Sequence, residues 1–300
     1  AAKTARSKML LLATAPLAAA LHEPRPLSRR QAAVHPPLSR RQAFLGMGCA
    51  CCVTRPDVAH GLATLAQPDV ARYERFALQR DAAKDAGFAR GMKEGMGQYE
   101  TAVAPTKARL FERLFAAVPA VEPVIVELGI GTYPNAPFYA RAAPQRIDVV
   151  GVDPNEAMEP YAKRAAASAG LEERGHSLRV VSGVGEALPL ADSSVDAVVC
   201  TLTLCSVRDP AATVAEVRRV LRPGGFFLFL EHVLSPTDAL LAQQQRALTP
   251  LQVQSADGCH LDRQTLSTVR AAGFASVDAE ITDLRGFWVL SPTAAGIAVR

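Results

Sequence analysis

The sequence predicts an α/β fold in which helices cover both faces of a mostly parallel, doubly wound sheet. Apolar runs of strand length alternate with helical segments, and the runs are near-continuous, as in strands buried on both faces. Such a sheet places its ligand crevice at the carboxyl ends of the strands. The strands are expected in residues 124–128, 149–153, the start of 180–190, 194–202 and 226–230.

The first expected strand ends in a glycine turn, and the second ends in a carboxylate. Gly129 and Gly131 let the backbone turn sharply and approach a ligand without a Cβ atom in the way. Asp153, about twenty residues further on, can accept both hydroxyls of a ribose. Tyr133 and Pro134 stand where a dinucleotide site needs a small residue and free N–H groups. The pattern therefore disfavours NAD and favours a phosphate-free nucleoside cofactor such as S-adenosylmethionine.

A helix is expected to connect the fourth and fifth strands. Asp209 is suited to cap its N-terminus, and Pro210 to occupy its first turn. An apolar stripe follows at helical spacing, and Pro223-Gly224-Gly225 is expected to stop the helix before the next strand. The stripe consists of Val214, Val217, Val220 and Leu221.

Residues 67–119 are expected to form an N-terminal helical segment. Glycines at 87, 91, 95 and 97 interrupt its middle, and glycine costs helix stability, so the sequence predicts two helices with a mobile join. The segment either covers the ligand crevice as a lid, touches a membrane, or packs against the sheet. The α/β domain is expected to follow over residues 120–300.

Residues 1–66 are expected to form a targeting leader. The apolar run 9–21 lies behind three basic residues and is too short to span a bilayer, as in a secretory signal. The following alanine-rich segment has arginine pairs at 29–30 and 40–41 and resembles a plastid transit peptide followed by a twin-arginine signal. We expect a plastid location, in the stroma, at the thylakoid membrane or in the lumen. A disordered basic arm, or an acylation site at the cysteines of 49–52, is the alternative.

Charge and cysteine spacing exclude other classes of function. The net charge is +4, and the excess of basic over acidic residues lies in the first 55 residues. A nucleic-acid surface is therefore not indicated for the rest of the chain. Cys200, Cys205 and Cys259 lack paired C-x-x-C spacing, so no metal site is expected. Cys200 and Cys205 are expected to pack around the end of the fourth strand, with Cys205 near the acceptor site. The sequence contains no internal repeat and no transmembrane helix.

Four ordered motifs resemble those of class I S-adenosylmethionine-dependent methyltransferases, over about residues 120 to 235. They are Glu127-x-Gly-x-Gly-Thr132, Gly151-Val-Asp-Pro-Asn155, Gly185-Glu-Ala-Leu-Pro189 and Arg218-Arg-Val-Leu-Arg-Pro-Gly-Gly225. Three further segments resemble the methyltransferase-like 7 group, whose animal members resemble thiol S-methyltransferases. These segments are residues 192–207, Glu231-His-Val233 and Asp257-Gly-Cys-x-Leu261. The resemblance implies a Rossmann-like fold with a seven-stranded sheet.

Carried over residue by residue, the resemblance implies a cofactor site. Glu127, Gly129, Gly131 and Thr132 would lie beside the methionine part of S-adenosylmethionine, with Asp153 on its ribose hydroxyls. The alternative for Glu127 is a carboxylate that caps nearby N–H groups, and for Asp153 a turn residue at a strand end.

The adenine end of the implied site departs from the family pattern. Gly185 and Glu186 would lie near adenine, and Thr201 is a further cofactor-binding candidate. Many members place an aspartate where this chain has Val184, so adenine recognition must depend on backbone groups or on Glu186.

The resemblance implies methyl transfer to a small acceptor, most simply the sulfur of a lipophilic or small thiol. His232 and His260 are the candidates for assisting thiol deprotonation, and a structural role is the alternative for each. Methylation of oxygen or carbon on a phenol or quinone is the second hypothesis. A binding or assembly subunit without catalysis, with an assembly partner, is the third. Peripheral membrane association is compatible with each.

Overall fold

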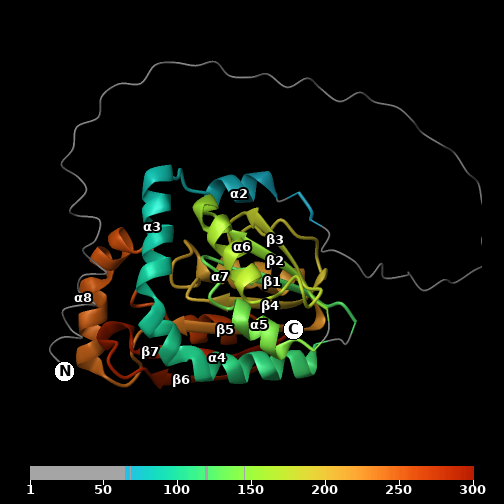
Figure 1. The fold of residues 1–300 in the computed structure, drawn as a ribbon. Helices are drawn as coiled ribbons and strands as arrows, with labels where there is room; N and C mark the ends of the chain where they lie inside the picture. The colour runs from blue at the N-terminus through green and yellow to red at the C-terminus, as the bar shows by residue number, and fades with distance from the viewer. Residues whose placement is uncertain (1–64, 68, 119–120, 145) are drawn as a thin grey trace, which may run out of the picture.

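The computed structural model describes residues 65–67, 69–118, 121–144 and 146–300 (Figure 1). The leader expected over residues 1–66 lies outside the described residues except for its last two. Of these, Leu65 forms an antiparallel bridge with Leu190. No helix in the described ranges is long and apolar enough to cross a membrane.

The sheet has seven strands in the order β3-β2-β1-β4-β5-β7-β6. The first five strands in this order, β3, β2, β1, β4 and β5, pair in parallel with their neighbours. Strand β7 pairs antiparallel with both β5 and β6. This confirms the predicted doubly wound, mostly parallel sheet. The strands are β1 (Val124–Leu128), β2 (Asp148–Asp153), β3 (Ser177–Ser182), β4 (Val195–Thr201), β5 (Leu221–His232), β6 (Ser276–Asp283) and β7 (Pro292–Val299).

Helices cover both faces of this sheet, so β1, β2 and β4 are apolar along nearly their whole length and buried. One buried apolar cluster joins α4, α5 and α6 to one face, and the other joins α7 and α9 to the opposite face. In the first cluster, Phe111 of α4 meets Tyr139 of α5 edge to face at 4.9 Å between ring centroids. The helices on the two faces are α4 (Gly97–Ala117), α5 (Ala136–Ala142), α6 (Glu159–Ser168), α7 (Pro210–Val220) and α9 (Thr265–Ala271). The remaining elements between β2 and β7 are η1 (Glu156–Met158), α8 (Ala239–Ser255) and η2 (Trp288–Leu290).

Helix α7 begins as predicted but ends earlier. The Asp209 carboxylate accepts a hydrogen bond from the backbone N–H of Ala212 at 3.0 Å, and Pro210 is the first helical residue. The helix ends at Val220, because Leu221 is already extended with φ −62° and ψ 141°. The expectation that Pro223-Gly224-Gly225 stops the helix is therefore wrong. This segment lies within β5, whose pairing with β4 shifts register between Val195 and Ala197.

The N-terminal segment contains three helices where two were predicted. They are α2 (Val70–Phe76), α3 (Ala82–Gly95) and α4. Gly87 and Gly91 lie inside α3, where a Cβ atom at either position would meet nothing within 4 Å, and the break falls at Met96. Helix α4 contributes to the core of the sheet, so this segment is not a separate packing unit.

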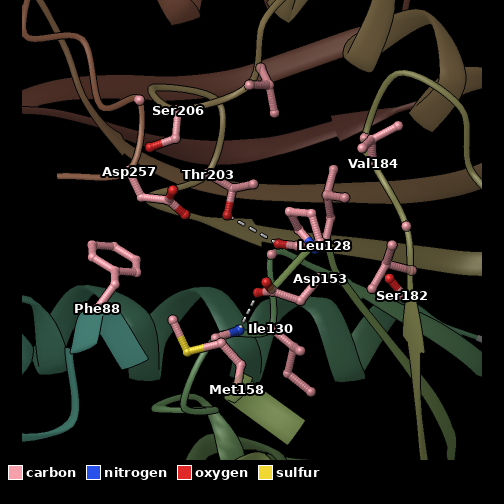
Figure 2. A pocket seen from close by; sticks show the side chains of 18 of the residues that line it. Phe88, Leu128, Ile130, Asp153, Met158, Ser182, Val184, Thr203, Ser206 and Asp257 are labelled. Atoms are coloured by element: carbon pink, nitrogen blue, oxygen red, sulfur yellow. Dashed lines mark hydrogen bonds between the residues drawn. The ribbon is translucent and has the colours of Figure 1, made fainter. Parts of the chain in front are cut away.

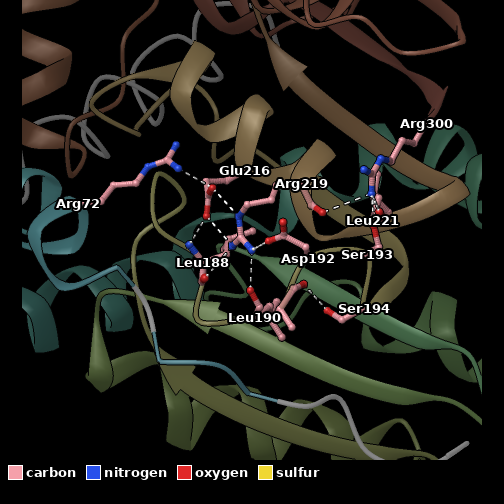
Figure 3. A network of polar contacts seen from close by, with 11 residues as sticks. Arg72, Leu188, Leu190, Asp192, Ser193, Ser194, Glu216, Arg219, Leu221 and Arg300 are labelled. Carbon is pink, nitrogen blue, oxygen red and sulfur yellow. Dashed lines mark hydrogen bonds and ion pairs between the residues drawn. The ribbon is translucent and has the colours of Figure 1, made fainter. Parts of the chain in front are cut away.

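A network of buried and half-buried charges holds the loop between β3 and β4 against α7 (Figure 3). The carboxylate of Glu216 on α7 is 3% exposed and pairs with Arg219 at 2.8 Å and with Arg72 of α2 at 2.7 Å. Its second oxygen accepts from the backbone N–H of Leu188, and Arg219 donates to the carbonyl groups of Leu188 and Leu190. The network therefore fixes the loop that carries Gly185 and Glu186.

Candidate functional site

A cavity of about 610 Å³ lies where the loops after β1, β2, β3 and β4 meet (Figure 2). Its volume falls within the range of about 300–1,000 Å³ typical of small-molecule sites. The connections from β1 to β2 and from β4 to β5 run in opposite directions along the sheet, so the crevice between the adjacent strands β1 and β4 is the switch point at which doubly wound folds bind ligands. The N-terminal helices α2 and α3 and the loop at 257–258 complete the wall.

Glycine is required at the turn after β1. Gly129 has φ +65°, and a Cβ atom there would lie 2.1 Å from Oγ1 of Thr203. Gly131 has φ +53°, but its Cβ would meet no atom closer than 3.9 Å. Both glycines and Thr132 line the cavity. At Gly131 the backbone thus leaves room for a bound group.

Asp153 projects into the cavity from the end of β2. Its two oxygens accept hydrogen bonds from the backbone N–H groups of Gly131 and Asn155, each at 2.9 Å. Burial raises the pKa of Asp153 to about 6, although these two bonds and the nearby Arg80 lower it. A carboxylate has about four acceptor positions, so this one retains capacity for two hydroxyl donors.

Glu127 lies behind the cavity wall and does not line it. Its carboxylate accepts hydrogen bonds from the Asn135 side-chain amide and the Tyr139 hydroxyl. Burial raises the pKa of Glu127 to about 7, against the lowering effect of these two donors. The same Asn135 amide donates to Thr201 Oγ1 at 3.0 Å, and Thr201 lines the cavity. Glu127 therefore supports the wall, and its direct contact with a cofactor stays a prediction.

The residues expected near adenine all line the cavity. A Cβ atom on Gly185 would lie 2.8 Å from Thr213 Cγ2, so this position requires glycine for close packing on α7. Glu186 accepts from the backbone N–H of Asp209 at 3.0 Å, which positions the start of α7. Val184 also faces the cavity and has no polar side-chain group to offer an adenine amine.

No sequence motif indicated the ion pairs in the cavity wall. Arg80, just before α3, pairs with Asp85 at 2.8 Å and with Asp257 at 3.0 Å. Asp257 follows α8, and Figure 1 shows α3 and α8 at the same side of the sheet. An apolar wall from the N-terminal helices lies beside these charges. It is formed by Phe76, Leu78, Phe88, Met92 and Met96.

The two predicted catalytic histidines do not line the cavity. His232, at the end of β5, places Nε2 3.3 Å from Cys259 Sγ and 3.0 Å from the His260 carbonyl oxygen. Burial lowers the pKa of His232, but the thiolate of Cys259 and the carboxylate of Glu231 outweigh this effect and raise it. His260 Nδ1 lies 2.8 Å from the Gly258 carbonyl oxygen. A role for either histidine as a base stays a prediction.

Glu231, which was not among the predicted site residues, organises the loop after β4. Its buried carboxylate accepts from the backbone N–H groups of Thr203 and Leu204 at 2.9 and 3.1 Å. Thr203 in turn donates to the carbonyl group of Leu128, and Figure 2 shows this bond beside the cavity. An acidic residue at the end of a buried apolar strand was the available signal.

The fold and the cavity define a Rossmann-like methyltransferase domain. The family model described as "Methyltransferase domain" matches residues 126–229, and S-adenosyl-L-methionine is the cofactor of that family. The cavity fits this cofactor, because Gly131 leaves open space and Asp153 has acceptor positions to spare. One solved structure with a similar fold is a chain from the complex between the Haloferax volcanii Trm112 methyltransferase activator and a methyltransferase. Its TM-score against this chain is 0.53, at 19% sequence identity. That match covers 74% of this chain and 98% of the other, and it shows the fold.

Two relatives define the family more narrowly. Human thiol S-methyltransferase TMT1A is 35% identical over 207 residues, which cover 67% of this chain and 81% of TMT1A. The chain belongs to this methyltransferase family. Rat thiol S-methyltransferase TMT1B is 41% identical over 162 residues, which cover 53% of this chain and 63% of TMT1B. The match thus spans less than two thirds of the rat protein.

Proposed function

We propose that this protein transfers the methyl group of S-adenosylmethionine to the sulfur of a lipophilic or small thiol. The observation that carries the proposal is a cavity lined by two chemically different sets of side chains. Asp153 and Glu186 suit a nucleoside, and Phe76, Leu78, Phe88, Met92 and Met96 give an apolar wall. The family relationship to TMT1A supports a thiol acceptor.

The cofactor supplies an electrophilic methyl group on a sulfonium, so the protein's task is to align the acceptor and exclude water. The apolar wall of Phe76, Phe88 and Met92 excludes water from an acceptor chain. The thiolate is the reactive form of a thiol, and nearby cations lower a thiol's pKa. Of the two arginines that line the cavity, Arg80 is already paired with Asp85 and Asp257, so Arg208 is the cation that would favour the anion there. The thiol releases its proton to solvent before the transfer, without a dedicated base.

An acceptor panel tests this function. The full chain is incubated with S-adenosylmethionine and alkyl thiols of increasing length, a catechol or a quinol, and methylated products are identified by mass spectrometry. We expect S-methylation with kcat/KM rising with chain length. Asp153→Ala should weaken cofactor binding by about 1–3 kcal/mol, or about 5- to 150-fold, because it loses charge-assisted hydrogen bonds. Methylation of only the catechol or quinol supports an oxygen or carbon methyltransferase acting on a phenol or quinone. Cofactor binding without turnover of any acceptor supports a binding or assembly subunit without catalysis.

Cofactor affinity is expected to fall as the pH drops through about 6, the raised pKa of Asp153. The ribose hydroxyls donate to the ionised carboxylate, so binding favours ionisation and lowers this pKa. By linkage, the Kd is lowest above about pH 6 and rises as Asp153 becomes protonated in the free protein. Calorimetric titrations between about pH 5 and 8 measure this change. Asp153→Asn, which cannot ionise, should bind weakly with a flat profile across this range. An unchanged wild-type Kd contradicts the prediction.

A further inference from the structure

Three metal-ligating side chains converge behind the cavity wall, at residues that the proposed reaction does not use. The ligand atoms of Cys205, His232 and Cys259 all lie within 4.8 Å of one another. The exposed fractions of these residues are 1%, 3% and 7%. They come from separate parts of the chain, namely the loop after β4, the last residue of β5 and the loop after α8. None of the three cysteines in the described residues forms a disulfide.

We propose that Cys205, His232 and Cys259 bind one thiophilic metal ion, Zn²⁺, which ties the loop after α8 to the carboxyl ends of β4 and β5. Sulfur and imidazole nitrogen are the donors that zinc prefers, and a Cys₂His set is a known ligand combination. The sequence did not indicate this site, because it lacks the paired local spacing of most zinc motifs.

The distances suit zinc. Zinc–sulfur bonds of about 2.3 Å and zinc–nitrogen bonds of about 2.0–2.1 Å place tetrahedral donors about 3.5–3.8 Å apart. Cys259 Sγ is 3.3 Å from His232 Nε2, and no pair of donors in the cluster exceeds 4.8 Å. Small side-chain rotations are therefore enough to reach coordination distances. The ion would displace the contact between His232 Nε2 and the His260 carbonyl oxygen, now 3.0 Å.

The charge of the donor set favours a divalent ion. Two bound thiolates and one neutral imidazole carry two negative charges, so Zn²⁺ makes the donor set neutral. A monovalent ion such as Cu⁺ would leave a net negative charge on these buried donors. Three protein donors leave one position of a tetrahedral ion for a further ligand.

The backbone around the cluster is already held in place. His260 donates its backbone N–H to the Cys205 carbonyl oxygen at 2.9 Å, which joins the two cysteine-bearing loops. The N–H of Cys205 donates to the Glu231 carboxylate at 3.3 Å. The loops approach so closely that a Cβ atom on Gly258, with φ +84°, would lie 3.0 Å from the Ser206 carbonyl oxygen. Such pre-arrangement reduces the ordering cost of binding an ion.

Metal content tests the proposal independently of methyl transfer. The full chain is purified without a histidine tag in the presence of a phosphine reductant, and its zinc content is measured by inductively coupled plasma mass spectrometry. We expect about one zinc per chain. After removal by a chelator, titration with Co²⁺ should produce thiolate-to-cobalt charge-transfer absorption, and chelation should lower the Tm.

Single substitutions distinguish ligands from neighbours. Cys205→Ser, Cys259→Ser and His232→Gln should each lower zinc affinity at least about tenfold. Cys200→Ser is the matched control, because Cys200 is buried on β4 and donates to Glu231 but lies outside the cluster. A folded, reduced wild-type protein that takes up neither Zn²⁺ nor Co²⁺ overturns the proposal, even where a ligand variant fails to fold. Equal loss of zinc in Cys200→Ser would also overturn the proposal. A Cys205–Cys259 disulfide found in protein whose free thiols are alkylated at lysis would do the same.

Discussion

Replacing Glu216 with alanine is expected to lower the free energy of unfolding by about 3 kcal/mol. The change leaves Arg219 and Arg72 without their shared carboxylate and leaves the buried N–H of Leu188 without its acceptor. Removing one partner of a buried network costs more than the pair contributes, here chiefly because the Leu188 N–H stays buried without an acceptor, whereas Arg219 keeps Asp192 and two carbonyl groups. For a domain of this size the Tm should fall by about 6–12 °C, measured by calorimetry.

Asp192→Ala is the matched control for this prediction. Asp192 also pairs with Arg219 at 2.7 Å, but its side chain is 78% exposed. Exposed pairs contribute about 0–1 kcal/mol, so the Tm should fall by no more than about 4 °C. Equal losses in the two variants would contradict the assignment of the buried carboxylate as the centre of the network. Glu216→Ala should also weaken cofactor binding, since the 184–190 loop loses its anchor.

Replacing Gly129 with alanine is expected to cost about 2–5 kcal/mol of stability and to abolish cofactor binding. The left-handed φ costs an alanine about 1–2 kcal/mol. Overpacking adds about 1–3 kcal/mol, because the new Cβ would lie 2.1 Å from Thr203 Oγ1. Thr203 has little freedom to move away, as its hydroxyl donates to the Leu128 carbonyl and its N–H is held by Glu231. Denaturant unfolding measures the stability change.

Gly131→Ala separates backbone strain from packing. Gly131 has a similar positive φ, but its Cβ would lie in open space at the cavity. This variant should lose only about 1–2 kcal/mol of stability. Its cofactor affinity should still fall, because the added methyl group occupies space available to the ligand. Stability losses of equal size in the two variants would contradict the packing argument at Thr203.

Much of the fold was predictable because its signals are local. Apolar runs located all five parallel strands, and capping residues located the start of α7 at Asp209. The predictions were wrong where local signals competed with tertiary packing. Glycine correctly predicted a break within residues 87–97, which falls at Met96, but Gly87 and Gly91 are tolerated inside α3. Pro223-Gly224-Gly225 predicted a helix stop, but Leu221 enters the sheet first because β5 pairs with β4 from that residue.

The sequence by itself determined the parallel sheet and the positions of Gly129, Gly131 and Asp153 at the cavity. These depend on strand length, turn geometry and spacing, all of which are written along the chain. Only the tertiary structure decided that Glu127 lies behind the wall, that Arg80 meets Asp257, and that Cys205, His232 and Cys259 converge. The contact of Arg80 with Asp257 and the Cys205–His232–Cys259 cluster join residues far apart in sequence. They meet because the strand order and the return of the chain after α8 bring them to the carboxyl ends of the strands. No local sequence pattern predicts that geometry.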